Sequence, residues 1–449
     1  MHDALQRGSE LVARRWPVSH RPLRSSITVA LAGGLALLGC GLTAPAAGAS
    51  SGVLKIAAIA PLSGATATLG KLMEGPCAGA VTVVNKAGGV LGHKLVCYPV
   101  NDLGDPADAV ANVSRALATT SNIVGAIGLT SATAATEVPI LNSAKVTMVS
   151  QNGLSEFTSH FYPYFWRMTP PDFDGGAALG LVAVRQGFKK VAVLIQNSTA
   201  NTGTRPGIVN ALKQHHVKIA SNLVIPGDAS SYDSVINGIR GTKPDGLIIS
   251  ADVQTTVTLL SEYKSLNNGQ VPPVIVPTGI LGSSLDSAVK KLMGVKYMTH
   301  DLTLVGTYVD TSSPAFKQYE AAVKHTSIGA TEASAILATQ AIGTIYDGII
   351  VMSLAMDAAH STTPAVYNKY MAEVTKSRKG AVVVHTYAQG VKALKQRRSI
   401  QYVGVTGPVA FDKFHNSSGE YASFTLTAKD NVVTGKIIGP ATISAITKG

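Results

Sequence analysis

Residues 122–153 (NIVGAIGLTSATAATEVPILNSAKVTMVSQNG) constrain the fold more than any other stretch of this chain. Two short apolar runs, 123–127 and 146–150, are rich in β-branched residues and flank a helix-length segment that ends near Asn142. This order predicts a strand–helix–strand unit whose strands pair in parallel and are buried on both faces. Such sheets hold ligands at the carboxyl ends of their strands. The stretch therefore predicts an α/β fold and also the place of a site.

Small polar residues follow both predicted strands: Thr130, Ser131, Ala132 and Thr133 after the first, and Ser150, Gln151, Asn152 and Gly153 after the second. Hydroxyl groups and free backbone N–H groups at the start of a helix suit an anionic or strongly polar ligand group. The alternative is that Ser131 and Thr133 only cap the helix. From these residues alone, both interpretations stay open.

The N-terminal segment has the organisation of a secretory signal peptide, with five arginines followed by an apolar run at 27–38. The run ends in Leu37-Leu38-Gly39-Cys40, which resembles the lipobox of bacterial lipoproteins, in which the cysteine is acylated. We therefore expect residues 1–39 to be removed and Cys40 to carry the lipid. Residues 40–52, rich in Gly, Ala, Ser, Thr and Pro, are expected to form a flexible tether.

Two cysteines remain once Cys40 is lipidated. Cys77 and Cys97 make an even pair in an oxidising compartment, where disulfides form. They fall on a predicted helix and on the strand after it, which are neighbours in a βαβ unit. A disulfide is favoured over two buried free thiols, and both possibilities stay open.

Length and composition narrow the class of protein. A chain of 449 residues is too long for one hydrophobic core, which predicts two lobes. Hydrophobic residues make up 46% and charged residues 14%, which favours a packed protein over a disordered one. The net charge of +12 comes without a basic run interleaved with aromatics, which argues against a nucleic-acid partner. Residence near anionic lipid headgroups accounts better for this charge.

The same order of elements occurs twice after the signal segment. The first series has predicted strands at 53–60, 94–100, 123–127 and 146–150, with a helix at 70–86 and another that starts at Asp105-Pro106. The second has strands at 190–196, 218–225, 246–250 and 273–277, with helices at 205–215, 232–240 and 254–266. A strand at 301–308, helices at 333–358 and 365–379 and a β-rich segment from about 400 follow. The repetition predicts two similar α/β lobes.

These features resemble the type I periplasmic solute-binding proteins of ABC importers, in the branched-chain amino acid (Leu/Ile/Val)-binding family. The resemblance covers residues 53 to about 440. It rests on Pro61-Leu62-Ser63-Gly64, NKAGGVLGHKL (85–95), NDLGDPADA (101–109), the Ser131 loop, and Gly407-Pro408 with Phe411-Asp412. It implies two Rossmann-like lobes joined by a three-crossing hinge, which close over a ligand bound between them.

The resemblance also implies where the lobes divide. The N-terminal lobe would comprise 53–168 and 303–405, and the C-terminal lobe 169–302 and 406–447. The three crossings would fall near 166–172, 299–305 and 404–410.

Ligand residues of the first lobe carry over in part. Ser131 matches the family serine whose hydroxyl helps to hold a ligand carboxylate, with Thr130 before it and Ala132 after it. Asn152 and Gly153 occupy the second loop that holds this carboxylate in the family, but the loop is one residue shorter and lacks the family's threonine pair. Leu69 stands where the family often has an aromatic residue.

The second lobe departs further from the family. Asn201 or Thr202 stands where an aromatic residue is usual, and Thr278 stands where the family has the acid that receives the ligand's ammonium group. Asp252 falls at the neighbouring aromatic position. An unpaired ammonium in a dry site costs several kcal/mol, so an amino acid ligand requires that Asp252 point into the cleft. Otherwise a neutral or carboxylate-bearing ligand is expected, which the missing aromatic residues also favour.

The sequence thus predicts a lipid-anchored receptor on the extracytoplasmic face of a bacterial cell membrane. It would act as a monomer without a cofactor, capture a small polar or amphipathic solute, and deliver it to an ABC permease. The alternative is a receptor subunit that senses the same ligand for a signalling system. An enzyme is not expected, because no histidine has metal-ligand or nucleophile-base spacing and residues 128–132 lack the pattern of a nucleophile elbow.

Overall fold

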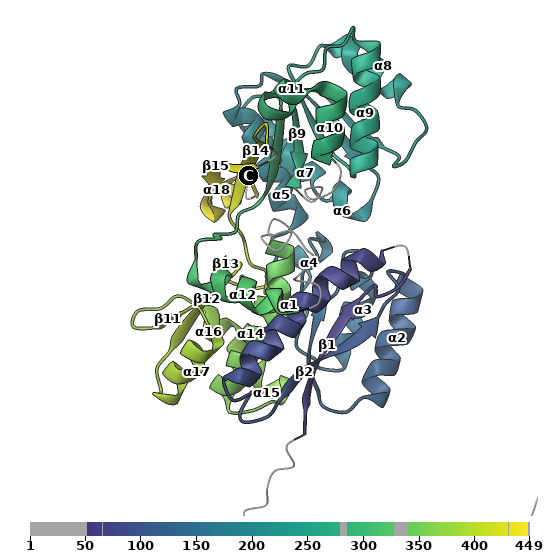
Figure 1. Ribbon diagram of the computed structural model, residues 1–449. Helices are drawn as coiled ribbons and strands as arrows, with labels where there is room; N and C mark the ends of the chain where they lie inside the picture. The colour runs from purple at the N-terminus through teal and green to yellow at the C-terminus, as the bar shows by residue number, and fades with distance from the viewer. Residues whose placement is uncertain (1–51, 65, 279–284, 327–339, 430, 448–449) are drawn as a thin grey trace, which may run out of the picture. The chain divides into compact units, whose positions relative to one another are not determined.

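A computed structural model of the chain describes residues 52–64, 66–278, 285–326, 340–429 and 431–447 (Figure 1). The expected signal peptide, Cys40 and all but the last residue of the expected tether lie outside these described residues, as do 333–339 of the helix expected at 333–358. The described chain forms two α/β lobes, each built on one mainly parallel sheet.

The first lobe is built on a five-stranded parallel sheet in the order β2-β1-β3-β4-β5. Its strands are β1 (Leu54–Ala60), β2 (Leu95–Asn101), β3 (Ile123–Gly128), β4 (Met148–Ser150) and β5 (Phe165–Arg167). Its connecting helices are α1 (Ala67–Lys86), α2 (Pro106–Thr119), α3 (Ala134–Ser143) and α4 (Glu156–Ser159). Alternate residues of β1 enter two different hydrophobic clusters, Ile56 on one face and Ala57 on the other. The sheet is therefore covered on both faces, as parallel sheets require.

Later segments of the chain complete this lobe. They are α12 (Pro314–Lys324), α14 (Gln340–Ala359), α15 (Pro364–Tyr367), α16 (Tyr370–Thr375), α17 (Tyr387–Lys395) and the small sheet of β11 (Val382–Val384), β12 (Ile400–Gly404) and β13 (Gly407–Pro408). Both α12 and α14 pack against α1. The Cys77–Cys97 disulfide ties α1 to β2, which agrees with the favoured of the two possibilities for these cysteines.

Helix α14 is the only part of the described chain that is long and apolar enough to cross a membrane by length and composition. However, 83% of its most apolar window, within Ala341–Ala359, is buried inside the protein. It contacts α1, α16, β3 and β4. Its apolar character is that of a core helix of the first lobe.

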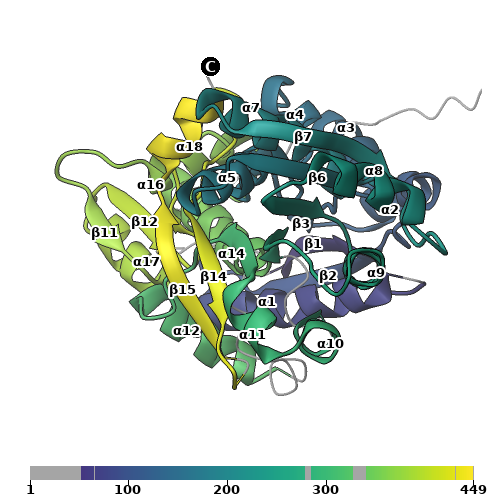
Figure 2. The same ribbon diagram turned by 90° about the horizontal axis from the view of Figure 1, so that it is seen from above.

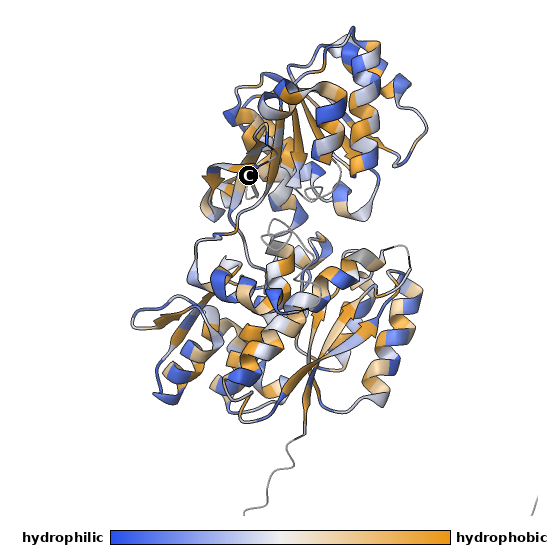
Figure 3. Ribbon diagram, in the orientation of Figure 1, coloured by the Kyte–Doolittle hydropathy of each residue, from blue (hydrophilic) through white to orange (hydrophobic). Residues whose placement is uncertain are grey.

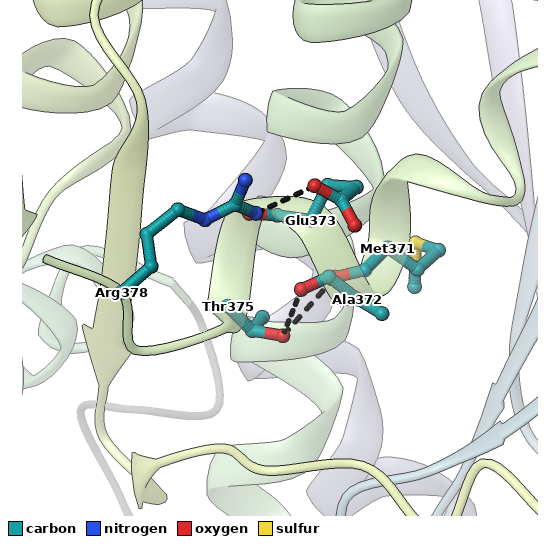
Figure 4. Close-up of polar contacts among 5 residues, drawn as sticks. All are labelled: Met371, Ala372, Glu373, Thr375 and Arg378. Carbon is teal, nitrogen blue, oxygen red and sulfur yellow. Dashed lines mark hydrogen bonds and ion pairs between the residues drawn. The ribbon is translucent and has the colours of Figure 1, made fainter. Parts of the chain in front are cut away.

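Side-chain hydrogen bonds form at the C-terminal end of the short helix α16 (Figure 4). Arg378 donates from Nη2 to the backbone oxygen of Glu373 at 2.7 Å and to its carboxylate at 2.6 Å. The Thr375 hydroxyl bonds to the carbonyl of Met371 at 3.2 Å. These bonds satisfy carbonyl groups that a helix end leaves without intrahelical partners. The ion pair itself is exposed and adds little to stability.

The second lobe is built on a seven-stranded sheet in the order β15-β14-β10-β9-β8-β6-β7. Its strands are β6 (Lys190–Gln196), β7 (Lys218–Ile225), β8 (Gly246–Ser250), β9 (Val274–Pro277), β10 (Leu302–Thr307), β14 (Tyr421–Leu426) and β15 (Val432–Ile438). Strands β6 to β10 are parallel, whereas β14 and β15 join antiparallel and lie side by side at one edge (Figure 2). Apolar residues concentrate on the strands of both main sheets (Figure 3).

Eight helices are described in the second lobe, and they flank its sheet. They are α5 (Asp172–Arg185), α6 (Thr199–Thr202), α7 (Arg205–Gln214), α8 (Asp233–Thr242), α9 (Val253–Leu266), α10 (Leu285–Met293), α11 (Val295–His300) and α18 (Pro440–Thr447). Two separate hydrophobic clusters cover the opposite faces of the sheet, with Leu194 in one and Val193 in the other. This lobe is therefore layered in the same way as the first.

Three crossings connect the lobes, at 168–171, 308–313 and 409–420. The second and third lie later in the chain than expected. Strand β10 pairs with β9 and β14 of the second sheet, so the expected crossing at 299–305 and the lobe boundary at 303 are wrong. Strand β13 pairs with β12, so 407–408 belong to the first lobe and the boundary at 406 is wrong as well. The expected boundaries failed because a strand's local pattern does not reveal the sheet to which it hydrogen-bonds.

Candidate functional site

The carboxyl ends of three neighbouring strands bring the predicted first-lobe loops together. Ile59 of β1 lies opposite Gly128 of β3, and Gly128 lies opposite Ser150 of β4. Because these strands are parallel and end at the same edge, the loops that follow them are neighbours. Leu69, the 130–132 turn and the 151–154 loop all follow strands at this edge.

The 130–132 turn leaves polar groups available. The backbone oxygen of Thr130 accepts hydrogen bonds from Thr133 N (3.2 Å) and Ala134 N (2.9 Å), which starts α3. The hydroxyl of Ser131 and the backbone N–H groups of Ser131 and Ala132 make no hydrogen bond within the described residues. Ser131 is half-buried and Ala132 is exposed. These unpaired donors at a helix N-terminus are suited to hold an anionic oxygen.

The capping alternative for these hydroxyls finds no support in the structure. Thr133 occupies the N-cap position of α3 but makes no side-chain capping bond. Its hydroxyl instead donates to Asp102 Oδ2 at 3.2 Å. The hydroxyl of Ser131 is therefore not needed to start the helix.

The loop after β4 uses its polar groups internally. Asn152 is 1% exposed, and its side-chain Nδ2 donates to Ser150 Oγ at 2.6 Å while its Oδ1 accepts from Leu154 N at 3.1 Å. Gly153 packs directly against the Asp172 side chain, so any larger residue would collide with that carboxylate. Asn152 thus shapes the loop, and the expectation that its amide faces a ligand does not match this geometry.

Leu69 and Thr278 belong to different lobes. Leu69 lies in the first turn of α1 and is 50% exposed. Thr278 follows β9, and its hydroxyl packs against Gly306 of β10. The residues that follow Thr278, 279–284, lie outside the described residues.

Asp252, the acid expected to receive an ammonium group, is engaged in its own lobe. It is the N-cap of α9, where Oδ1 accepts from Thr255 N at 2.7 Å. Its Oδ2 accepts from Gln196 Nε2 at 2.6 Å, and its backbone N–H donates to Gln196 Oε1 at 2.7 Å. The condition for an amino acid ligand is not met, because both carboxylate oxygens of Asp252 are bonded within its own lobe.

Asn201 belongs to the same polar network. Its Oδ1 accepts from Ser250 Oγ at 3.1 Å and its Nδ2 donates to Ser198 Oγ at 2.8 Å. Asn201, Asp252 and Gln196 therefore lie together at the carboxyl ends of β6 and β8, with most of their polar atoms already paired.

Asp172 is the acid that the sequence analysis missed. It begins α5 directly after the first crossing, and its side chain packs against Gly153 of the first lobe and Gly203 of the second. Its Oδ2 is buried and has no hydrogen-bond partner among the described residues. Burial raises the pKa of Asp172 to about 6, and the charge of Arg167 opposes this rise. The available signal was an acid directly after Pro170-Pro171 in a crossover next to a ligand loop.

Nothing in the described part of the chain groups three or more His, Cys, Asp or Glu residues as a metal site would need. The site therefore consists of hydroxyl, amide and backbone groups, with Asp172 at the first crossing. This composition suits non-covalent binding of a small polar molecule.

Comparison with known proteins identifies the family and the fold of this chain. Residues 53–375 match the family model described as periplasmic binding protein. No curated protein matches the chain. Solved structures of similar fold include the leucine-binding protein LivK of Thermotoga maritima, with 16% identity over 86% of this chain and 99% of that one, and a TM-score of 0.66.

Two further structures illustrate the range of ligands held on this fold. The branched-chain amino acid transporter substrate-binding protein LivJ of Streptococcus pneumoniae, solved with isoleucine, is 17% identical over 87% of this chain and 100% of that one, with a TM-score of 0.65. A solute-binding protein of an ABC transporter of R. palustris, solved with 4-hydroxybenzoate, is 16% identical over 89% of this chain and 100% of that one, with a TM-score of 0.67. At these identities the likeness concerns the fold.

The family match covers most of the described chain and includes the loops of the first lobe discussed above. It confirms the expected fold and the expectation of a binding protein that is not an enzyme, and it implies an extracytoplasmic location. This chain belongs to the periplasmic binding protein family.

Proposed function

We propose that this protein captures a small carboxylate for an ABC importer and holds it against the 130–132 turn. The carrying observation is that the Ser131 hydroxyl and the N–H groups of Ser131 and Ala132 have no partner within the described residues. A carboxylate oxygen would accept hydrogen bonds from these groups. The partial positive charge at the N-terminal end of α3 would also stabilise its negative charge.

The ligand class is proposed to be a carboxylate without an ammonium group. An amino acid would need an acid opposite its ammonium, and the carboxylate oxygens of Asp252 already cap α9 and bond to Gln196. The solved neighbours include one protein with benzoate and one with 4-hydroxybenzoate, which makes an aromatic carboxylate a reasonable first probe.

A second candidate ligand, a free amino acid, is favoured by Asp172. Its buried Oδ2 has no hydrogen-bond partner in the described part of the chain, and it lies against Gly153 of the second carboxylate loop. An ammonium group would pair with this carboxylate. Two solved neighbours hold isoleucine or leucine, so both classes belong in the test.

Calorimetric titration with benzoate, 4-hydroxybenzoate, leucine and isoleucine tests the proposal. We expect a carboxylate without an ammonium group to bind, and Ser131→Ala to weaken it by about 10- to 150-fold, because a hydrogen bond to a charged group contributes about 1.5–3 kcal/mol. The melting temperature of unliganded Ser131→Ala should stay that of wild type, because this hydroxyl makes no internal bond. Unchanged affinity with a lower melting temperature would instead favour a capping role.

The variant Asp172→Asn separates the two ligand classes. It should leave the affinity for benzoate unchanged or higher, because it removes a negative charge near the site. If leucine or isoleucine binds and loses most of its affinity in Asp172→Asn, the amino acid alternative replaces the proposal.

The membrane anchor and the permease partner are part of the proposal. Cys40 at the end of the lipobox-like segment would carry the lipid, and the permease would receive the ligand from the anchored, monomeric protein. Cell fractionation provides the measurement: Cys40→Ser should move the protein from the membrane to the soluble extracytoplasmic fraction. Retention of Cys40→Ser in the membrane would contradict lipid anchoring.

A further inference from the structure

Asp102 joins three loops at the ligand edge of the first sheet. It directly follows β2, and its backbone N–H donates to the carbonyl of Ala60 at the end of β1 (3.1 Å). Its Oδ1 accepts from Gly104 N in its own loop (2.9 Å), and its Oδ2 accepts from Thr133 Oγ1 at the start of α3 (3.2 Å). No part of Asp102 is exposed. One carboxyl group thus sets the relative positions of the loops after β1, β2 and β3.

Glu137 lies one turn after Thr133 on α3, so its side chain is on the same helix face as the hydroxyl that donates to Asp102. The Asp102 and Glu137 carboxyl groups each influence the pKa of the other. Glu137 is fully buried, and no backbone or side-chain N–H or O–H donor of the described residues bonds to either of its carboxyl oxygens. In the described part of the chain, no lysine, arginine or histidine is among the groups that shift the pKa of either carboxyl group. Two ionised carboxylates in one buried cluster, without a cation, repel each other strongly, so one of them keeps a proton.

The charged residues of the helix that packs against α3 do not neutralise the charge of this acid pair. The helix that packs against α3 is α2, and the charged residues of α2 and its N-cap are Asp105, Asp108 and Arg115. All three are exposed to solvent. The acid pair is therefore isolated from compensating charge in its surroundings.

The Thr133 hydroxyl, which donates to Asp102, lies directly after the proposed ligand turn at 130–132. Thr133 Oγ1 lies 3.4 Å from Thr130 Oγ1, and Thr133 N donates to the Thr130 carbonyl at 3.2 Å. Ser131 and Ala132 lie between these two threonines. A shift of Thr133 would therefore move the donors proposed to hold the ligand.

We infer that Asp102 and Glu137 share one proton, and that this acid pair is the positioning device that keeps the 130–132 turn in its ligand-binding shape. The ligand-binding part of this inference rests on the proposed function, whereas the shared proton does not. A hydrogen bond between two carboxyl groups forms only while one of them is protonated, and such a bond is short and strong. Loss of that proton would replace the bond by repulsion beneath the turn.

Burial, together with the charge of Asp102, raises the pKa of Glu137 to about 8. An unfolded chain would release this proton near the ordinary value of 4.5. Because the folded protein binds the proton more tightly, the contribution of the pair to stability is complete below about pH 4.5. It decreases as the pH rises and is lost above about 8.

A pH titration by NMR tests the shared proton without any ligand. Protein labelled with carbon-13 at the glutamate carboxyl carbons is titrated from pH 4 to 9.5, and the Glu137 signal is assigned by its absence in Glu137→Gln. We expect a midpoint near 8, with the amide signals of 130–134 following the same midpoint in wild type. In Glu137→Gln, which keeps the side-chain shape and a hydrogen-bond donor, those amide signals should no longer follow pH in this range.

Two further variants complete the test. Glu156→Gln, which removes an exposed acid of the same lobe, should titrate like wild type. Asp102→Asn should lower the Glu137 midpoint, because it removes the negative charge that raises the pKa of Glu137. This variant provides the test if Glu137→Gln does not fold. A Glu137 midpoint near 4.5, or amides of 130–134 that ignore the Glu137 titration, would overturn the inference.

Binding of benzoate as the probe connects the pair to the ligand turn. The dissociation constant should be constant up to about pH 7 and should rise about tenfold per pH unit above about 8, while Glu137→Gln stays constant. If the NMR pattern appears but benzoate does not bind, the acid pair stands and the proposed carboxylate function fails. If benzoate binds to wild type with an affinity that is independent of pH up to 9.5, the positioning role is wrong.

Discussion

At the scale of single residues, the wholly buried carboxylate of Asp347 links two segments of the first lobe by hydrogen bonds. It lies in α14 and accepts hydrogen bonds from the hydroxyl of Tyr402 (2.7 Å), the backbone N–H of Val405 (3.1 Å) and both the N–H and the hydroxyl of Thr406 (2.7 Å each). Burial raises the pKa of Asp347, and these four bonds oppose the rise. The core helix of the first lobe is thereby tied to the turn that precedes the third crossing.

Replacing Asp347 by alanine should lower the free energy of unfolding by about 2–5 kcal/mol. The reason is that several buried donors would lose their acceptor, and each unpaired buried donor costs about 1–3 kcal/mol. Asp347→Asn should cost less, because the amide oxygen still accepts some of these bonds. Chemical denaturation measures both, with the exposed Asp108→Ala as the matched control, expected within about 1 kcal/mol of wild type. An Asp347→Ala variant as stable as this control would contradict the role assigned to the carboxylate.

The site shows what residue patterns can and cannot predict. The position of Ser131 after a parallel strand predicted a polar turn at the ligand edge, and that turn is where the unpaired donors lie. Asn152 and Asp252 also follow strands in the sequence. However, the Asn152 amide bonds within a local turn, and the Asp252 carboxylate caps a helix. Which polar atoms remain unpaired depends on three-dimensional neighbours that no local pattern records.

At the scale of secondary-structure elements, the sequence predicted correctly a helix start that depends only on neighbouring residues. The Asp105-Pro106 pair predicted a helix start, and Asp105 caps α2 by accepting from Ala107 N (2.8 Å) and Asp108 N (3.2 Å). The strand expected at 301–308 exists as β10, but its sheet was assigned wrongly. Its pairing partners, β9 and β14, come from separate parts of the chain, and strands buried on both faces have the same pattern in either sheet.

The segment from α15 to α17, residues 364–395, was the least predictable part. A helix was expected at 365–379, whereas the chain forms the short helices α15 and α16, then β11, and then α17. Helices of four to six residues carry too few positions to show a period. The strand β11 has only three residues, so its identity depends on pairing with β12.

At the scale of the whole molecule, the first and third hinge crossings meet beside Trp166, which is the only tryptophan among the described residues. It lies in β5 just before the first crossing, where its ring stacks on His415 of the third crossing at 3.7 Å between centroids. Backbone bonds join the same segments, from Arg167 N to His415 O (3.0 Å) and from Ser417 N to Arg167 O (2.9 Å). Movement at either crossing should therefore change the surroundings of this indole ring.

Two lobes joined by three short crossings are expected to move by hinge closure around a ligand, as proteins of this architecture do. The ligand would shift the population toward the closed form by its higher affinity for that form. Closure would bring the polar network of Asn201 and Asp252 to the other side of a ligand held at Ser131. Capture of the ligand would then depend on closure of the lobes.

Small-angle X-ray scattering of the purified protein, with and without the carboxylate identified by calorimetry, tests this claim most directly. We predict that the radius of gyration decreases at saturating ligand, with Trp166 emission changing over the same concentration range. Ser131→Ala at the same ligand concentration should keep the radius of the unliganded protein. Calorimetric binding that leaves both the radius of gyration and the Trp166 emission of wild type unchanged would contradict capture by lobe closure.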